Sequence, residues 1–591
     1  MTLPRAVPLY FGPEGRSLFG WLHPAADPAA SRAVLICNPF GYEALCAHRS
    51  LRNLAESIAR SGVSAMRFDY FAAGDSSGSE TDRDLVEAWV VSVGSALDEL
   101  KRLTGVSRVC LVGLRLGATL AVMAAQGRSD IAGLVAIAPV VKPRAYLREL
   151  RALALTGEVP TPPEGVQVDA DLQEAAGFGL TAQTREALAK IDLTSMPSMP
   201  APRVLILERN DLPADPSLGA HWQALGATVE RRQFTGYTEM MLDAHRTVVP
   251  TAMIDAVVGW IGLENNGARD GEVTTYPVSN VALLEDARVR ETAVWLDGER
   301  SLFGILAEPA DTAVSARQVV LLLNSGAVSH VGPGRLYVTL ARHLARRGAV
   351  VLRVDISGIG DSYPHAGEPE NSVYTSRAAG DIQTCFDYLR QHFVGARYHA
   401  LGICLGAYHA FKAVVAGLPF QSAVLINPLT FFWKEGMSLA QPAFVAAESA
   451  RYRANMLRPS AWLKVLRGKV NLRGVLRTLT HRAKHLTMSA LYELARFFRL
   501  RLADDLAAEL VQATNHSAQL LFVFSSSDPG QTLLREQGGF AVARLVRQGD
   551  LKIEIIEGAD HTFTPHWARS ELLSVLTAHL KTSGESPGAS S

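Results

Sequence analysis

The sequence predicts two α/β domains in tandem, each built on a mostly parallel, doubly wound sheet. Short apolar runs alternate with amphipathic ones, a pattern typical of a parallel sheet with helices on both faces. The chain has 591 residues, more than one hydrophobic core usually organises. The first half also recurs in the second. These observations predict domains at 1–263 and 274–582, a polar linker at 264–273 and a disordered tail at 583–591.

The duplication is visible in matching motifs. Arg16 to Gly20 recurs as Arg300 to Gly304, and Gly74-Asp75-Ser76 recurs as Gly360-Asp361-Ser362. The interval stays between 284 and 289 residues until the elbows described below, and then grows to 317 and 322. One long repeat indicates a tandem duplication, because solenoid repeats are far shorter. The growing interval predicts an insertion in the second copy.

The elements of the second half follow from its apolar periodicity. Strands are expected at 319–323, 349–354, 398–401, 422–426, 519–524 and 551–556, and helices at 335–347 and 378–390, among others. Ligands of such sheets bind at the carboxyl ends of the strands.

Each half contains a Gly-x-x-x-Gly turn between a predicted strand and an Ala-rich helix. Residues 113–117 read Gly-Leu-Arg-Leu-Gly, and residues 402–406 read Gly-Ile-Cys-Leu-Gly. This context is that of a nucleophile elbow, which lifts its central side chain above the sheet. Cys404 is a nucleophile, whereas Arg115 is a permanent cation that cannot attack a carbonyl. The sequence therefore predicts one working site and one degenerate site.

The second half supplies a nucleophile, an acid and a histidine in the expected chain order. Cys404 is followed by Asp528 and His561, each just past a predicted strand. His561 is expected to act as base, with Asp528 orienting the imidazole. Backbone N–H groups of Leu405 and of the turn holding Ser325 and Gly326 are the expected oxyanion donors.

Each of these signals is weak alone, because a single Cys, Asp-Pro-Gly turn or His more often has a structural role. Their shared order and strand-end positions favour a triad. Asp560, directly before His561, is an alternative acid that we assign to a turn.

In the first half, the corresponding positions hold Arg115, Asp211 and Glu239, so both nucleophile and base are lost. Simple decay of an unused site explains this. A second hypothesis is that Arg115 forms an ion pair with Glu239 or Asp211, since a buried arginine needs a partner.

Composition favours a globular cytoplasmic protein without nucleic-acid partners. There are 58 basic and 58 acidic residues, and no apolar run approaches the ~20 residues of a membrane span. The N-terminus lacks the apolar core of a signal peptide. Five cysteines form neither a disulfide framework nor a metal-ligand pattern, so no metal is expected.

Several motifs resemble one known family. They are Asn38 to Gly41, Phe68 to Ser76 and Gly113 to Ala118 in the first half, and His330 to Arg335 and Asp355 to Ser362 in the second. With these, the chain resembles α/β-hydrolases of the serine aminopeptidase type, particularly those found beside bacterial exosortase and exopolysaccharide genes. The resemblance spans both halves except 430–515. It implies tandem α/β-hydrolase domains, the second with a helical cap inserted at about 430–515.

Cys404 departs from the serine usual at this position. In this respect the second half is similar to dienelactone hydrolases, polyhydroxyalkanoate synthases and the cysteine acyl shuttles of natural-product assembly lines. Enzymes with a cysteine on this fold are often transferases, because a thioester intermediate exchanges readily with thiols, amines and alcohols.

The predicted cap is strongly basic. Residues 434–501 hold 14 Lys or Arg against 3 Asp or Glu, a formal charge of +11. A solvated helical face is the simplest explanation. The alternative is a docking surface, including Arg467, Arg473 and Arg477, for an acyl carrier protein with its phosphopantetheine, for coenzyme A or for an anionic glycan.

Three functional hypotheses follow. The first is an acyltransferase that moves an acyl group from a carrier-protein or coenzyme A thioester, through Cys404, to an alcohol or amine in natural-product or exopolysaccharide biosynthesis. The second is a thioesterase or esterase-type hydrolase. The third is a non-catalytic scaffold. No cofactor beyond these donor carriers is expected, and the oligomeric state stays open.

Overall fold

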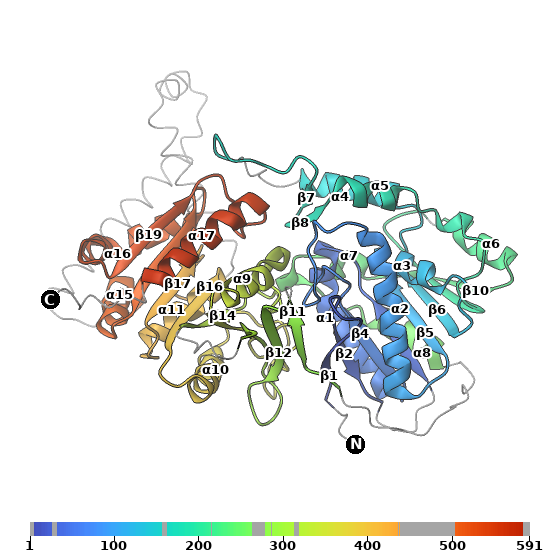
Figure 1. Cartoon of the computed structure of the whole chain (residues 1–591), viewed down its shortest axis with the longest axis horizontal. Coiled ribbons are helices and arrows are strands. Elements are labelled where there is room, and N and C mark those ends of the chain that lie inside the picture. The colour runs from blue at the N-terminus through green and yellow to red at the C-terminus, as the bar shows by residue number, and fades with distance from the viewer. Residues whose placement is uncertain are drawn as a thin grey trace.

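The chain forms two large α/β sheets that lie side by side (Figure 1). The computed structural model describes residues 5–25, 32–155, 162–213, 215–262, 278–284, 287–311, 318–434, 437 and 503–582. The predicted linker, the predicted tail and most of the predicted cap, including Arg467, Arg473 and Arg477, lie outside these residues. None of the described helices is long and apolar enough to cross a membrane.

The first sheet has eight strands in the order β1-β2-β4-β3-β5-β6-β9-β10, and a small hairpin, β7-β8, lies apart from it. Its strands are parallel from β4 onward. The strand bounds are β1 Val7–Phe11, β2 Leu18–His23, β3 Ala33–Cys37, β4 Ser64–Phe68, β5 Val109–Leu114, β6 Ile131–Ile137, β7 Gln173–Ala175, β8 Phe178–Leu180, β9 Arg203–Arg209 and β10 Thr228–Phe234.

The second sheet repeats this order and adds one edge strand: β11-β12-β13-β15-β14-β16-β17-β18-β19. All six strands predicted in this half are present within two residues of their predicted ends. The bounds are β11 Val281–Leu284, β12 Val289–Trp295, β13 Phe303–Pro309, β14 Gln318–Leu323, β15 Val350–Asp355, β16 Arg397–Ile403, β17 Ser422–Ile426, β18 Gln519–Ser525 and β19 Leu551–Ile556. The fold class predicted from the sequence is therefore confirmed.

Helices cover both faces of each sheet, so each sheet has a separate buried core on either side. In the first half they are α1 Tyr42–Arg60, α2 Leu85–Thr104, α3 Leu116–Ala125, α4 Pro143–Ala154, α5 Ala182–Ala189, α6 Ser217–Ala224, α7 Tyr237–Met240 and α8 Thr251–Gly262. In the second half they are α9 Leu336–Ala345, α10 Ala378–His392, α11 Leu405–Val415, α15 Leu506–Asn515, α16 Pro529–Gln548 and α17 His566–Thr582. Short 3₁₀ turns occupy Leu193–Ser195, Ala244–Arg246 and Pro333–Arg335.

The two sheets meet at their antiparallel edges. The Tyr10 backbone N–H donates to the Ser279 carbonyl at 2.7 Å, next to β11. A fifth apolar cluster is shared by the halves, with the Trp21 and Phe303 rings 4.5 Å apart at their centres. The contact between the halves is thus partly a common core.

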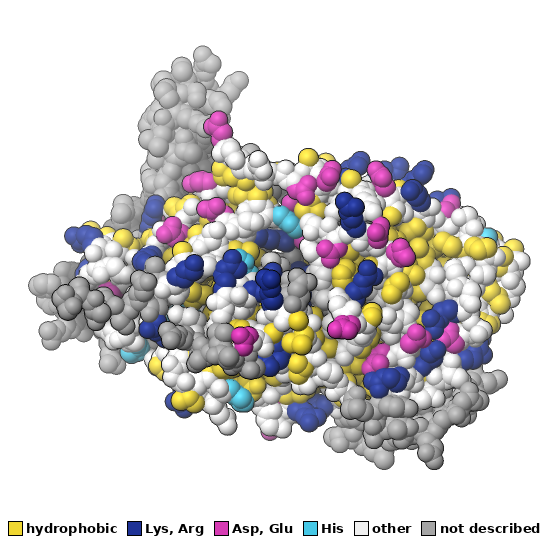
Figure 2. All heavy atoms as spheres, in the orientation of Figure 1, with side chains coloured by type: hydrophobic (Ala, Val, Ile, Leu, Met, Phe, Trp, Pro, Cys, Tyr) yellow, Lys and Arg dark blue, Asp and Glu magenta, His cyan; other side chains and the backbone are white. Residues whose placement is uncertain are grey.

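Acidic and basic side chains are intermixed on the outer surface seen in Figure 2, in keeping with the balanced charge.

Beside this core, the halves exchange buried ion pairs in a mutual pattern. Arg353 contacts Asp75 at 2.6 Å, and its counterpart Arg67 contacts Asp361 at 2.9 Å. In each pair, the arginine comes from one half and the aspartate from the other. The halves therefore pack like the subunits of a twofold dimer, in which each partner gives the same contact that it receives.

Arg353 is fully buried in this network, as are its partners Asp75 and Glu291. Its guanidinium has no exposed surface and also contacts Glu291 at 3.0 Å, and Glu291 in turn binds Arg342 at 2.8 Å. A buried carboxylate that loses its cation keeps its desolvation cost without compensation. The association of the two halves therefore depends on each buried charge of this network having a partner of opposite charge.

We predict that Arg353→Met lowers the free energy of unfolding by about 3–5 kcal/mol, because Asp75 and Glu291 lose a buried cation. Urea denaturation followed by circular dichroism measures this. Arg390→Met is the matched control, since Arg390 and its partner Asp387 are exposed on α10. Equal stability of the two variants would contradict the prediction.

Candidate active site

Cys404 lies at the sharp turn between β16 and α11, at the carboxyl edge of the second sheet. Its backbone has φ 57° and ψ −109°, a strained conformation for a residue with a Cβ. The flanking glycines are required by close contacts. A Cβ at Gly402 would lie 2.2 Å from the Gly406 backbone, and a Cβ at Gly406 would lie 2.5 Å from the Leu323 carbonyl oxygen. This geometry is that of a nucleophile elbow.

A buried tyrosine holds the elbow against the neighbouring strand. The Tyr337 hydroxyl accepts a hydrogen bond from the Ile403 N–H at 3.0 Å and donates one to the Leu323 carbonyl at 2.9 Å. It therefore links the end of β14 to the residue before Cys404. The sequence did not indicate this role, because a tyrosine within an apolar helical pattern is usually a core residue.

The predicted acid and histidine are in contact. His561 Nδ1 lies 2.6 Å from Asp528 Oδ2, and the Asp528 side chain is fully buried. Asp528 also caps α16, because its Oδ1 accepts the Gly530 N–H at 2.8 Å. Its carboxylate is thus fixed from both sides, and Pro529 begins the helix directly behind it.

The second ring nitrogen of His561, Nε2, is buried and has no hydrogen-bond partner among the described residues. The Cys404 thiol nevertheless lies close enough to His561 to act on its pKa. Burial disfavours the imidazolium, but Asp528 and the nearby Cys404 outweigh burial and raise the pKa of His561 to about 10. Contacts of this kind often tighten only when substrate is bound.

An asparagine joins the loops that carry the acid and the histidine. Asn427 follows β17, donates its side-chain N–H to the His561 carbonyl at 2.7 Å and accepts the Ser525 N–H at 2.9 Å. The Asp560 carboxylate instead accepts the Thr564 N–H at 2.7 Å, which confirms its assignment to a turn. Strand-end position marked Asn427 in the sequence, but its two partners depend on tertiary structure.

The expected oxyanion donors lie at the same edge of the sheet. Leu405 is the first residue of α11, where N–H groups lack helical acceptors. Ser325 and Gly326 follow β14, in a turn anchored by Asn324, whose side chain donates to Asp355 at 2.8 Å and accepts the Ile356 N–H at 2.8 Å. That Leu405, Ser325 and Gly326 stabilise an oxyanion stays a prediction.

An aromatic group packs beside the elbow and was not predicted as part of the site. The Tyr374 and Trp433 rings stack with centroids 4.3 Å apart, and Tyr374 shares a buried cluster with Leu405. The Tyr374 hydroxyl is buried without a hydrogen-bond partner among the described residues. Its backbone has φ 56°, unusual for a tyrosine. Desolvation raises its pKa, and the charge of Cys404 raises it further.

The elbow at Arg115 has the same backbone shape as the elbow at Cys404. Arg115 has φ 53° and ψ −120°, close to the values of Cys404. Its guanidinium binds Glu43 at 2.7 Å and also Glu149. The predicted pairing with Glu239 or Asp211 is wrong, because α1 and α4 place nearer carboxylates at the guanidinium. Asp211 instead binds Arg209 at 2.9 Å. Glu239 lies on α7, where its backbone carbonyl accepts a hydrogen bond from the Val248 N–H.

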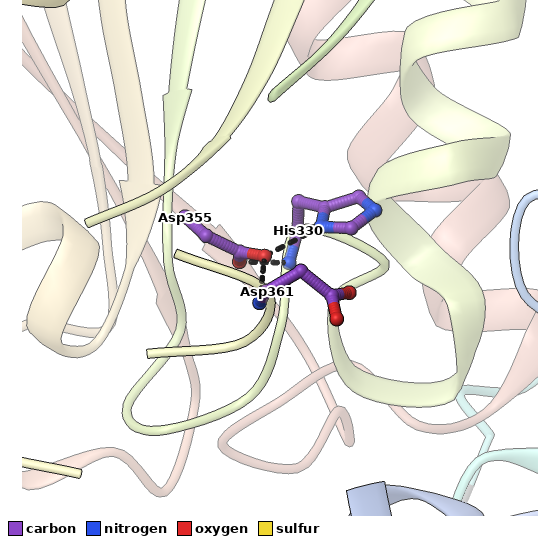
Figure 3. A group of neighbouring side chains, drawn as sticks. All are labelled: His330, Asp355 and Asp361. Carbon is purple, nitrogen blue, oxygen red and sulfur yellow. Dashed lines mark hydrogen bonds and ion pairs between the residues drawn. The ribbon is translucent and has the colours of Figure 1, made fainter. Parts of the chain in front are cut away.

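His330, Asp355 and Asp361 form a compact group, in which a ring nitrogen of the histidine and one carboxylate oxygen of each aspartate lie within 4.8 Å of one another (Figure 3). Both His330 nitrogens bind carboxylates, Nδ1 to Asp355 and Nε2 to Asp75, each at 2.7 Å. Burial opposes protonation, but these two carboxylates raise the pKa of His330 well above its usual value. With both ring nitrogens in contact with carboxylates, His330 joins Asp355 of its own half to Asp75 of the other in an ion-pair cluster.

The strand order and the elbow in each half define the α/β-hydrolase fold. A family model described as serine aminopeptidase, S33, matches residues 315–563, which include Cys404, Asp528 and His561. This match covers less than half of the chain. No curated protein matches the sequence.

Solved structures are similar to one half of the chain at a time. Est1E from Butyrivibrio proteoclasticus with bound ferulic acid is 19% identical, with 43% of this chain and 96% of that chain covered and a TM-score of 0.32. DcsB in complex with its substrate analogue is 16% identical, with 44% and 97% covered and a TM-score of 0.32. Dienelactone hydrolase from Anabaena variabilis is 15% identical, with 50% and 98% covered and a TM-score of 0.30.

We predict that Arg115→Ala destabilises the protein by about 3 kcal/mol, since Glu43 loses its buried cation, and leaves Cys404 chemistry intact. Urea denaturation and iodoacetamide labelling of Cys404 measure the two effects. The double variant Arg115→Ala/Glu43→Ala should recover part of the stability. Loss of Cys404 labelling in a folded Arg115→Ala protein would show that the first half shapes the working site.

The raised pKa of His561 predicts a pH-dependent contribution to stability. A histidine whose pKa is higher in the folded state stabilises the protein fully below its unfolded value, here 6.5. The contribution is lost as the pH rises from there to about 10. The difference in thermal unfolding midpoint between wild type and Asp528→Asn should therefore shrink over this range. A constant difference from pH 6 to pH 10 would contradict the assignment.

Proposed function

We propose that the protein is a cysteine acyltransferase whose nucleophile is Cys404, with His561 as base and Asp528 as the group that orients His561. The observations that carry the proposal are the strained elbow at Cys404 and the contact between His561 and the buried Asp528. The family match to hydrolases over residues 315–563 supports an acyl-group substrate.

In the first step, His561 Nε2 takes the thiol proton while Cys404 Sγ attacks the carbonyl carbon of a thioester donor. The tetrahedral oxyanion is held by the N–H of Leu405 and by the turn of Ser325 and Gly326. The donor thiolate leaves with the proton from His561, and an acyl-Cys404 thioester remains. Asp528 holds the imidazole tautomer and stabilises its cation.

In the second step, an alcohol or amine loses its proton to His561 and attacks the acyl-Cys404 carbonyl. The product leaves, and His561 returns the proton to the Cys404 thiolate. A thioester favours this exchange because a thiolate is a better leaving group than the alkoxide of an acyl-serine. We further propose that the basic segment 434–501 attracts the anionic carrier protein or coenzyme A of the donor.

Hydrolysis is the second candidate. Water in place of the alcohol or amine would give a thioesterase or esterase, and the hydrolase family match favours this alternative. A non-catalytic scaffold is the third. The contact between His561 and Asp528 argues against it, because the first half keeps the strained elbow at Arg115 but has no such pair at the corresponding positions.

We predict that a short-chain acyl-coenzyme A adds one acyl mass to the protein, on Cys404, as measured by intact-protein and peptide mass spectrometry. Cys404→Ala should remove the adduct, and Asp528→Asn should slow its formation by about 10²–10⁴-fold. The buried thiol Cys385, changed to Ala, is the matched control. Adducts that decay faster with added amines or alcohols support transfer, whereas decay independent of them supports hydrolysis. If no thioester forms an adduct with the protein, both the acyltransferase and the hydrolase hypotheses are contradicted.

A further inference from the structure

A pocket of about 140 Å³ lies between the two halves, away from Cys404. Its first-half wall includes Phe40, Tyr70, Trp89, Phe178 and Asp69, and its second-half wall includes the loop at 327–331. An apolar cavity of similar volume is large enough for a benzene-sized molecule. The proposed function does not use this space, and residues of the ion-pair cluster, among them Asp75 and His330, form part of its wall.

Asp69 at this pocket is the counterpart of Asp355 in the second half. Asp355 accepts four hydrogen bonds: from Asn324 at 2.8 Å, from the His330 N–H at 2.6 Å, from His330 Nδ1 at 2.7 Å and from the Asp361 N–H at 2.9 Å. Within the described part of the chain, Asp69 accepts only one, from the Asp75 N–H at 3.0 Å.

The first half does not supply these donors in the same way, because Ala44 occupies the position that corresponds to His330. Asn38, the counterpart of Asn324, turns its amide to the Phe68 carbonyl at 2.8 Å. His48 binds Asp361 of the other half at 3.2 Å, and Arg67 binds the same carboxylate. No ion pair among the described residues includes Asp69. Burial and the charge of Asp75 accordingly raise the pKa of Asp69 to about 6.

Aromatic rings surround the space in front of this carboxylate. The Phe40 ring lies 5.3 Å from Trp89 and 6.3 Å from Phe178, measured between centroids. Aromatic faces attract organic cations, and the attraction grows when water is excluded. A carboxylate that has no ion-pair partner and shares a pocket with aromatic rings therefore favours a ligand with an ammonium group attached to an apolar group.

Four arginines, Arg49, Arg52, Arg67 and Arg335, also line the pocket. Arg67 is paired with Asp361, and Arg335 donates to three backbone carbonyls of residues 74–78. Arg52 donates to the Ser362 carbonyl and is paired with Glu370, and Arg49 donates to the Thr247 carbonyl. Their charges favour an anionic ligand, whereas the carboxylates of Asp69 and Asp75 oppose one. We expect the charge of Asp69 to favour a cationic ligand over an anionic one, because no ion pair among the described residues neutralises Asp69.

We propose that this pocket binds a small primary amine with an aromatic or aliphatic body, whose ammonium group pairs with Asp69 and takes the place that the His330 imidazolium has beside Asp355. The proposal goes beyond the proposed function and does not depend on chemistry at Cys404.

Benzylamine, benzyl alcohol and benzoate are matched probes, because they differ mainly in the charged or polar group. Isothermal titration of the full chain at pH 7.5 should show benzylamine binding at least tenfold tighter than either of the others. Asp69→Asn keeps the acceptor for the Asp75 N–H and should weaken benzylamine binding at least tenfold. Leu120→Trp should abolish binding by filling the pocket, which Leu120 lines.

Asp255→Asn, on the exposed face of α8, is the control and should bind benzylamine like wild type. Cys404→Ala should also bind normally, which separates this site from the proposed active site. Benzyl alcohol or benzoate binding as tightly as benzylamine, unchanged binding by folded Asp69→Asn, or no benzylamine binding by wild type would each overturn the proposal.

Discussion

The buried guanidinium of Arg353 is the contact on which the relation of the two halves depends. It binds Asp75 from the first half and Glu291 from the second, in a place without solvent. Asp75 also binds His330, and His330 binds Asp355. Asp355 in turn holds Asn324, which anchors the turn of the predicted oxyanion donors. A chain of charged contacts thus runs from the degenerate half to the proposed catalytic edge.

This arrangement gives a physical reason for keeping a half without a nucleophile. The second half alone would expose His330, Arg353 and Glu291 at one edge of its sheet, and each would lose compensation that Asp75 and its neighbours provide. Arg335 extends the dependence, because its guanidinium donates to the carbonyls of Gly74, Ser76 and Gly78 in the first half. Substitution of the nucleophile by Arg115 leaves all of these contacts intact, so the degenerate elbow can lose its chemistry without cost to the interface.

The two halves also show how one backbone accommodates different chemistry. Arg115 and Cys404 have nearly the same strained φ and ψ, yet Arg115 is neutralised by Glu43 and Glu149, whereas Cys404 faces an unpaired imidazole nitrogen. Asp69 and Asp355 diverge in a similar way, one facing a pocket and the other saturated with hydrogen bonds. For Arg115 the helices α1 and α4 set the difference, because they carry Glu43 and Glu149, and for Asp355 the loop that carries His330 sets it.

The sequence by itself determined the fold class, the strands of the second half and the placement of Cys404, Asp528 and His561 just past strand ends. Strand periodicity and glycine spacing are local, and chain order constrains which strand ends meet, so these features can be read without coordinates. The partners of Arg115, the roles of Tyr337, Asn427 and His330, and the pocket at Asp69 were decided only by tertiary structure. Their partners lie up to 255 residues away, as for His330 and Asp75, and no sequence pattern specifies which of many carboxylates a buried cation will meet.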